Sequence, residues 1–165
     1  MLKLFKKINK KFLITMVVGT VALGALTGCS GKKEEAKNLS AVEIGEKIKQ
    51  AVNLDEMKEG DNDKLQKLYD ISADEIENFV LYVAPTNLKA DEVAVIKVKD
   101  ANDVESVKGK LSKRVEEQGK SFKDYLPDEY FLIEKHVLKT KDNYVLLAIS
   151  KDADKIESAF DEALK

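Results

Sequence analysis

The first 29 residues limit how much of this chain can enter a folded domain. Five lysines and no acidic residue occupy residues 1–11, and an uncharged, mainly apolar run of 17 residues follows, from Phe12 to Gly28. A membrane-spanning helix needs about 20 apolar residues, so this run is short for a permanent anchor. A basic start, an apolar stretch and small residues at its end are typical of a secretory signal peptide. We therefore expect residues 1–28 to be removed and to take no part in the fold.

The apolar run ends at the only cysteine of the chain, Cys29. The tetrapeptide LTGC at 26–29 resembles the lipobox of bacterial lipoproteins, in which an aliphatic residue and two small residues precede a cysteine. The resemblance implies transfer of a diacylglycerol to the Cys29 sulfur and cleavage before Cys29. Two or more acyl chains anchor stably because each buried methylene contributes about 0.8 kcal/mol. The alternatives are an unmodified thiol on an uncleaved signal anchor and half of an intermolecular disulfide.

Lipidation of Cys29 predicts a location on the extracytoplasmic face of the cell membrane, with the membrane itself as a partner through the lipid anchor. Residues 29–38 then form the lipidated cysteine and a flexible tether, because SGKKEEAKN at 30–38 holds no apolar residue larger than alanine. Residues 39–165 remain for a single domain. Its core has to form without a disulfide, since the chain has no second cysteine.

The chain after Cys29 is acidic, with 23 basic residues against 30 acidic ones and a formal charge of −7. Nucleic-acid recognition depends on basic patches, so this balance argues against a nucleic-acid partner.

A comparison of the chain with itself at an offset of 52 residues shows a weak internal repeat. KDANDVES at 99–106 and KDADKIES at 151–158 share five of eight residues, and VAVIKV at 93–98 aligns with VLLAIS at 145–150 without a gap. The repeat predicts two β-β-α units, at about 76–122 and 128–164. Chance similarity between two segments rich in Lys, Asp and Glu is the alternative.

Four strands are expected, at 79–84, 93–98, 130–138 and 144–149, because these segments are rich in apolar, β-branched and aromatic residues. The fold class is therefore α+β, with a four-stranded, mainly antiparallel sheet. The strands at 79–84 and 145–149 are almost wholly apolar and should be central. VIKVK at 95–99 alternates, which favours an edge or half-exposed position.

The helices are expected from capping residues and from apolar periodicity. Ser40 and Glu43 form a capping-box pattern ahead of one helix, and DNDKLQKLYDI at 61–71 indicates a shorter second helix before the repeat. Asp100 and Asp152 are the expected N-caps of the two helices that close the repeated units. The apolar stripes of these helices are Val104, Val107 and Leu111 in the first and Ile156, Ala159 and Ala163 in the second.

No residue set in the sequence points to catalysis, to a metal or to a cofactor. His136 is the only histidine, and in an expected strand it is a surface or half-buried residue with catalytic base as the alternative. DNDKLQKLYDIS at 61–72 begins like a calcium loop, but Gln66 stands where glycine is required and Ser72 where a bidentate Glu belongs. We predict no catalytic residues, no metal site and no cofactor.

Aromatic side chains gather at the join between the two expected units. Such residues favour contact with a partner when they are exposed, and they fill the open end of a small sheet when they are buried. The sequence leaves both readings open. The candidate interaction surface consists of Phe122, Tyr125, Leu126, Tyr130 and Tyr82.

Three segments carry a resemblance to a known family: FVLYVAPTNLKADEVAVIKVKD at 79–100, KSFKDYLPDEY at 120–130 and NYVLLAIS at 143–150. Over about residues 40–163 the chain resembles lipoproteins of Gram-positive, mostly anaerobic bacteria that carry domain of unknown function 4358. The resemblance implies surface anchoring and transfers no activity, cofactor or site residue.

The leading functional hypothesis is a lipid-anchored module of the cell envelope that binds an envelope protein, a peptide or a small ligand. The alternatives are an enzyme that uses carboxylates alone on cell-wall material, which needs two acids about 5 to 9.5 Å apart across a cleft, and a passive structural protein.

Overall fold

The computed structural model describes residues 38–165, and the predicted signal peptide and most of the predicted tether lie outside them. Five strands form one sheet in the order β1-β2-β3-β5-β4, and every neighbouring pair is antiparallel. In chain order the elements are α1 (Ala41–Ala51), β1 (Lys58–Glu59), α2 (Asn62–Tyr69), β2 (Ile76–Val83), β3 (Glu92–Val98), a 3₁₀ turn (Ala101–Asp103), α3 (Val104–Phe122), α4 (Pro127–Glu134), β4 (Val137–Lys141), β5 (Tyr144–Ile149) and α5 (Ala153–Ala163).

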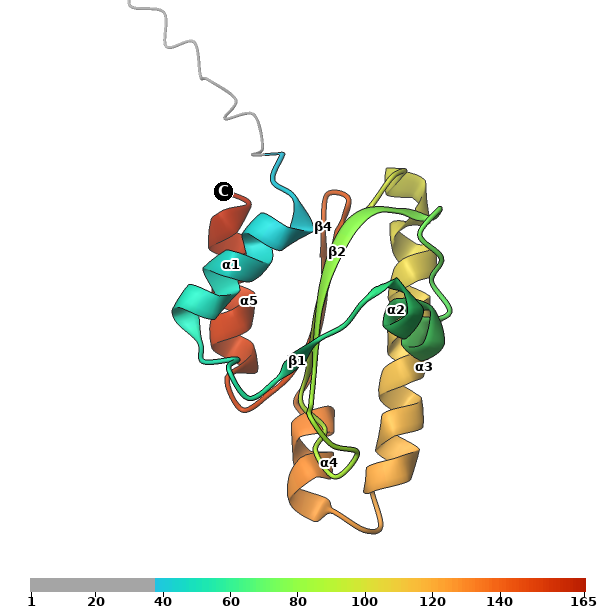
Figure 1. The fold of residues 1–165 in the computed structure, drawn as a ribbon, viewed down its shortest axis with the longest axis vertical. Coiled ribbons are helices and arrows are strands. Elements are labelled where there is room, and N and C mark those ends of the chain that lie inside the picture. Colours follow the sequence, from blue (N-terminus) through green and yellow to red (C-terminus); the bar gives the residue numbers. More distant parts are fainter. Residues whose placement is uncertain (1–37) are drawn as a thin grey trace, which may run out of the picture. The chain divides into compact units, whose positions relative to one another are not determined.

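Helices cover both faces of the sheet, so the domain has two hydrophobic cores (Figure 1). Alternate residues of β3 point to opposite faces. Ala94 and Ile96 belong to the core under α3, whereas Val93 and Val95 belong to the core under α1 and α5. The α+β class, the antiparallel sheet and the two leading helices α1 and α2 are confirmed. The expectation of four strands is wrong, because the short strand β1 adds a fifth beside β2.

The predicted edge position of VIKVK is also wrong. The segment lies in β3, which occupies the centre of the sheet and is buried along its whole length. The charged residue that suggested an edge, Lys97, is only 2% exposed. Its ammonium group donates to Glu77 Oε1 at 2.9 Å and to Asn38 Oδ1 at 2.6 Å, so the buried charge is paired.

The strand expected at 130–138 is a helix for most of its length. Pro127 opens α4, and Asp128 and Glu129 lie in its first turn. Proline at the first helical position and acidic residues near the N-terminus both favour a helix start. The strand β4 begins only at Val137, and His136 lies between the two elements rather than in a strand.

The repeat is limited to β3 with the start of α3 and β5 with α5. In the pairing of β3 with β5, Val93 lies opposite Ala148 and Val95 opposite Leu146, so each even-numbered residue of β5 shares a face with an odd-numbered residue of β3. The offset of the repeat, 52, is even, so the equivalent of an odd-numbered residue of β3 is an odd-numbered residue of β5. Equivalent residues of the two strands therefore point to opposite faces of the sheet. As a result α3 and α5 cover opposite faces of the sheet, and the two units are not related by a simple rotation.

The three predicted N-cap residues each stand at the N-terminus of a helical segment, but only two of them bond to a backbone N–H there. Ser40 and Glu43 form the reciprocal capping box of α1, and Asp100 caps the 3₁₀ turn that leads into α3 by accepting from the Asn102 N–H. Asp152 is the N-cap residue of α5, but its carboxylate binds Lys155 instead of a helix N–H.

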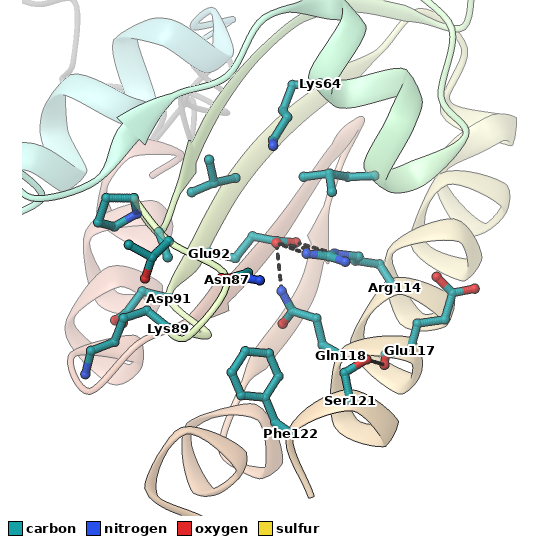
Figure 2. A pocket seen from close by; sticks show the side chains of 15 residues that line it. Lys64, Asn87, Lys89, Asp91, Glu92, Arg114, Glu117, Gln118, Ser121 and Phe122 are labelled. Carbon is teal, nitrogen blue, oxygen red and sulfur yellow. Dashed lines mark hydrogen bonds and ion pairs between the residues drawn. The ribbon is translucent and has the colours of Figure 1, made fainter. Parts of the chain in front are cut away.

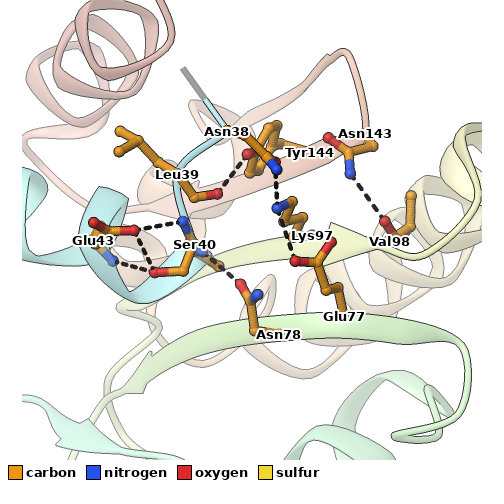
Figure 3. A network of polar contacts seen from close by, with 11 residues as sticks. Asn38, Leu39, Ser40, Glu43, Glu77, Asn78, Lys97, Val98, Asn143 and Tyr144 are labelled. Carbon is orange, nitrogen blue, oxygen red and sulfur yellow. Dashed lines mark hydrogen bonds and ion pairs between the residues drawn. The ribbon is translucent and has the colours of Figure 1, made fainter. Parts of the chain in front are cut away.

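A polar network fastens the first residues of the domain to three strands (Figure 3). The Asn38 side chain accepts from Lys97 of β3, the Leu39 carbonyl accepts from the Tyr144 hydroxyl of β5, and Asn78 of β2 accepts from the Ala41 N–H at 2.6 Å. This network lies at the end of the sheet where β3 finishes and β5 begins.

Two helix glycines should respond in opposite ways to substitution by alanine. Alanine is favoured over glycine in helix interiors by about 1 kcal/mol, and a Cβ on Gly109 of α3 meets no atom within 4 Å. On Gly45 of α1 it would lie 2.7 Å from Cγ1 of the buried, β-branched Val80. We expect Gly109→Ala to stabilise by about 0.5–1 kcal/mol and Gly45→Ala to destabilise by about 1–3 kcal/mol in urea titrations. Equal stabilisation by both would contradict the close packing of α1 on β2.

Candidate functional site

A cavity of about 630 Å³ lies between α2, the β2–β3 loop and α3. It is named here the Arg114 cavity, after the lining residue that extends from α3 toward Glu92 (Figure 2). Apolar side chains from three different elements line part of it, namely Leu68, Val83 and Phe122. The remaining surface is polar and carries both positive and negative groups. Its volume lies within the range of small-molecule sites, about 300–1,000 Å³.

The buried carboxylate of Glu92 organises the polar wall of the Arg114 cavity. Glu92 is the first residue of β3 and only 1% exposed. Arg114 Nη2 donates to Glu92 Oε2 at 2.8 Å, and Arg114 Nε lies 3.3 Å from each carboxylate oxygen. The Tyr69 hydroxyl donates to Oε1 at 2.8 Å and Gln118 Nε2 donates to Oε2 at 2.9 Å. Both oxygens are therefore occupied by donors from α2 and α3.

The electrostatics of this cluster hold Arg114 charged and Tyr69 neutral. Burial disfavours the Arg114 charge, but the hydrogen-bonded ion pair with Glu92 outweighs it and raises the pKa of the guanidinium. Burial, and then the negative charge of Glu92, raise the pKa of the Tyr69 hydroxyl well above its ordinary value. The hydroxyl therefore stays a proton donor to Glu92 at every physiological pH.

Several polar atoms at the cavity have no protein partner among residues 38–165. The hydrogen bonds of Arg114 use Nε and Nη2, so Nη1 has no partner in this part of the chain. The Lys64 ammonium, which points toward the space between the loop and α3 in Figure 2, makes no ion pair within the described residues. Gln118 Oε1 is buried and accepts no hydrogen bond from the described chain.

The β2–β3 loop, which forms one side of the cavity, is bonded to α4. Glu129 accepts from the Lys89 ammonium at 2.6 Å and from the Ala90 N–H at 2.8 Å. Glu129 is itself buried. A charge-assisted bond to a backbone N–H fixes the loop more firmly than the half-exposed lysine pair alone. The wall of the cavity is therefore held in place by α4, a helix that overlaps the strand expected at 130–138.

The Asp91 carboxyl, at the edge of the cavity, should destabilise the domain at neutral pH. Burial, and then the negative charge of Glu129, raise its pKa above the ordinary value of 3.8. The folded protein therefore binds more protons than the unfolded chain between the two pKa values, and stability falls as the pH rises through that window. We expect Asp91→Asn to raise the free energy of unfolding at pH 7 and to lose this advantage at pH 3, where the acid is protonated in both states.

Glu75 should show the opposite dependence of stability on pH, and urea titrations at pH 7 and pH 3 measure both effects. The hydrogen bond from Lys110, and then the Ser72 N–H, lower the pKa of Glu75 below 4.5. Its contribution is present above that value and is lost as the pH falls through the lower, folded pKa. Glu75→Gln should therefore destabilise at pH 7 and less so at pH 3. Matching pH profiles for the two variants would contradict these environments.

The comparisons with known proteins give one match. The sequence pattern of a domain of unknown function (DUF4358) matches residues 50–150, more than half of the chain. The chain belongs to the DUF4358 family. The match contains every residue that lines the Arg114 cavity in this DUF4358 domain. No curated protein and no solved structure matches the chain significantly.

The residues proposed as an interaction surface occupy two different faces of the DUF4358 domain. Phe122 is buried and lines the Arg114 cavity, and Leu126 and Tyr130 are half-buried against the core under α3. Tyr125 is exposed. Tyr82 belongs to the other core, under α1 and α5, where the Lys49 ammonium lies 4.8 Å from its ring centre. The structure therefore brings together the residues of 122–130 and separates them from Tyr82.

Cys29 lies outside the described residues. His136 Nδ1 lies 2.7 Å from the Ile133 carbonyl at the end of α4, and His136 does not line the Arg114 cavity. Within residues 38–165, no group of three or more His, Cys, Asp or Glu side chains could hold a metal ion. No helix in the same part of the chain is long and apolar enough to cross a membrane.

The residues that build the polar wall of the cavity were not predicted from the sequence: Glu92, Arg114 and Gln118. One signal was available, because Arg114 is the only arginine of the chain, all other basic residues being lysine. Arginine is preferred over lysine where a planar, bidentate pair with a carboxylate is needed. Gln118 follows one helical turn later, on the same face of α3.

Proposed function

We propose that this chain is a lipid-anchored protein of the extracytoplasmic membrane face that binds a small ligand in the Arg114 cavity. The observation that carries the binding proposal is the buried Glu92–Arg114 pair with its two further donors, Tyr69 and Gln118. Buried ion pairs contribute little to net stability, because desolvation offsets their attraction. The cluster is therefore better explained by the cavity it lines than by the fold.

The position of the cavity agrees with attachment through the N-terminal side. Glu92 begins β3, whereas Lys97, which binds Asn38, lies five residues further along the strand and on its other face. At about 3.4 Å per residue these two sites are about 17 Å apart along the strand. A domain held to a bilayer through residues 29–38 would thus keep the Arg114 cavity at the end of the sheet away from its attachment point.

Two alternatives receive less support. A carboxylate-only enzyme needs two free acids, and the buried carboxylate of the cavity wall, Glu92, is saturated by donors and cannot serve as one of them. A passive structural protein has no need of a buried ion pair in the wall of a cavity. Binding is the function that uses what this cavity offers.

The anchor is tested by mass spectrometry of the full chain recovered from membranes of the producing cells. We expect a protein that begins at Cys29 with a diacylglycerol on its sulfur, and a Cys29→Ser variant that is released from the membrane fraction. If residues 1–28 remain attached, or if Cys29 carries a free thiol, the anchor proposal is wrong.

The cavity is tested with two tryptophan substitutions on α3. Ser121 lines the Arg114 cavity, whereas Ser106 is an exposed residue of the same helix outside it. Small molecules that co-purify with the full chain are released by denaturation and identified by mass spectrometry. We expect Ser121→Trp to lose a compound that the wild type and Ser106→Trp both retain. Equal recovery from all three proteins, or no compound from any, would contradict a ligand in this cavity.

A further inference from the structure

We infer that the outer edge of β4 binds an extended peptide segment of another protein, which would continue the sheet as one more antiparallel strand. Strand β4 lies at one edge of the sheet, and none of its residues lines the Arg114 cavity. The edge is therefore a second binding surface, separate from the proposed ligand site. Addition of a strand to an open sheet edge is a common mode of peptide recognition.

The backbone groups of β4 that point away from the sheet can be identified from the neighbouring strands. The Val98 N–H donates to the Asn143 carbonyl at 2.9 Å, so odd-numbered residues of β5 bond toward β3 and even-numbered ones toward β4. The even-numbered residues of β5 lie opposite odd-numbered residues of β4. The N–H and C=O groups of Leu138 and Thr140 therefore point outward, and within residues 38–165 they make no backbone hydrogen bond there.

The opposite edge of the sheet is protected against pairing with another strand. Its edge strand, β1, is only two residues long, and after Gly60 the chain leaves the edge to enter α2. Next to it, β2 begins with an irregular register between Ile76 and Asn78. Very short edge strands and bulges are devices that prevent edge-to-edge pairing. The five-residue strand β4 has neither device, because its register with β5 is continuous, and it contains no proline.

The lysines of β4 do not shield its edge. A lysine on an edge strand usually opposes pairing by holding its charge in the solvent beside the strand. The Lys139 ammonium instead donates to Glu157 and to Asp161 of α5, at 2.7 Å in both cases. The Lys141 ammonium lies 3.3 Å from the Asp161 carbonyl. Both side chains are thus held against α5, and the outward backbone groups between them stay accessible to a strand.

The two faces of the sheet indicate which side chains the added segment carries. Residues opposite Leu138 and Thr140 would lie on the α3 face, where Leu138 packs against the hydrophobic core, so β-branched apolar residues fit there. A residue opposite Lys139 would lie on the α5 face, where two carboxylates already neutralise the ammonium, so an uncharged residue fits there. The chain after Cys29 has a formal charge of −7, which favours basic over acidic ends of the segment.

A second copy of this chain fits the edge less well, given the proposed anchor. Strand β4 ends where β5 begins, at the end of the sheet that Asn38 occupies. Antiparallel pairing of two β4 strands would place the second Asn38 at the opposite end. The eight residues of β2 alone span about 27 Å, and the nine residues 29–37 reach about 30 Å when fully extended. Two copies in one membrane would need a fully stretched tether, whereas a segment of another protein would not.

The test is fluorescence anisotropy of the full chain, purified in detergent, with the labelled, amidated probe peptide Lys-Thr-Val-Thr-Val-Thr-Lys. Two control peptides carry N-methyl groups, one on both valines and the other on the first two threonines. With valine side chains on the α3 face, the valine N–H groups face β4 and the threonine N–H groups face solvent. We expect the valine-methylated peptide to bind at least tenfold more weakly than the other two.

Thr140→Pro and Thr140→Val are the matched variants of the protein. Proline removes the outward N–H without removing a bond between β4 and β5, which is the position where an edge strand tolerates proline, and valine keeps that N–H. We expect Thr140→Pro to bind the probe at least tenfold more weakly and Thr140→Val to bind it like the wild type. Far-UV circular dichroism checks folding, and the methylated peptides remain decisive if Thr140→Pro does not fold.

Three results would overturn the inference: no binding of the probe to the wild type, equal binding of the two methylated peptides, or unchanged binding by a folded Thr140→Pro. Analytical ultracentrifugation without peptide tests the other occupant. We expect no change in oligomeric state between the wild type and Thr140→Pro. A wild-type dimer that Thr140→Pro dissociates would mean that the edge binds a second copy of this chain.

Discussion

Replacing Arg114 with methionine is expected to lower the free energy of unfolding by about 3–5 kcal/mol, the typical effect of removing one partner of a buried ion pair. Glu92 is 1% exposed, so its carboxylate would remain largely desolvated after its cationic partner is removed. Tyr69 and Gln118 would still donate to it, but neither carries a positive charge. Urea titration followed by circular dichroism measures the change as a lower midpoint at an unchanged slope.

The buried pair on the other face of the sheet serves as the matched control. Lys97 is only 2% exposed, but its partner Glu77 is 48% exposed. In Lys97→Met the buried charge itself disappears and Glu77 returns to water, so we expect a change within about 1 kcal/mol. A large loss from Lys97→Met together with a small one from Arg114→Met would contradict the burial of these two pairs.

Phe160→Ala is expected to cost about 3–5 kcal/mol, the usual effect of truncating a buried phenylalanine. The side chain is fully buried in the core formed by α1, α5 and one face of the sheet. The cavity left behind would be enclosed by both helices and the strands, which limits how far it can collapse.

Phe131→Ala is the control for the same chemical change at an exposed site. Phe131 of α4 is 55% exposed, so its truncation should change stability by about 0.5 kcal/mol or less. Both variants are compared with the wild type by urea titration. Similar losses for the two phenylalanines would mean that α4 is packed far more tightly than its exposure indicates.

The features that the sequence predicted correctly depend on neighbouring residues. The capping box of Ser40 and Glu43, the apolar runs of β2 and β5 and the stripe of α3 are patterns within a few residues of one another. Such local signals determine which elements form, because each amphipathic segment has to bury its apolar side whatever its partner is.

The features that the sequence did not predict depend on distant residues. The residues 130–133 are four apolar or aromatic side chains in a row and show no helical period, so only the start at 127–129, a proline followed by two acids, marks α4 as a helix. No residue near Lys97 in the sequence indicates that it is buried, because its partner Glu77 lies 20 residues earlier. The face that each helix covers follows from the pairing register of β3 with β5, which no local pattern contains.

The candidate site was missed for the same reason. Tyr69, Arg114 and Gln118 reach Glu92 from 22 to 26 residues away along the chain. The aromatic residues near the join drew attention because they are adjacent in sequence, and of these Phe122 does line the cavity. The lone arginine was the one local indication that a paired carboxylate would be found.

The bonds of Asn38, Leu39 and Ala41 also determine how the domain would bear a mechanical load. A pull that arrives from the N-terminal side reaches β3 through Asn38, β5 through Leu39 and β2 through Ala41 before it can peel α1 away. The three strands are neighbours in the sheet and share such a load through their hydrogen bonds. If the domain is anchored through its N-terminal side, as proposed, these bonds would protect the Arg114 cavity when a force pulls on the anchor.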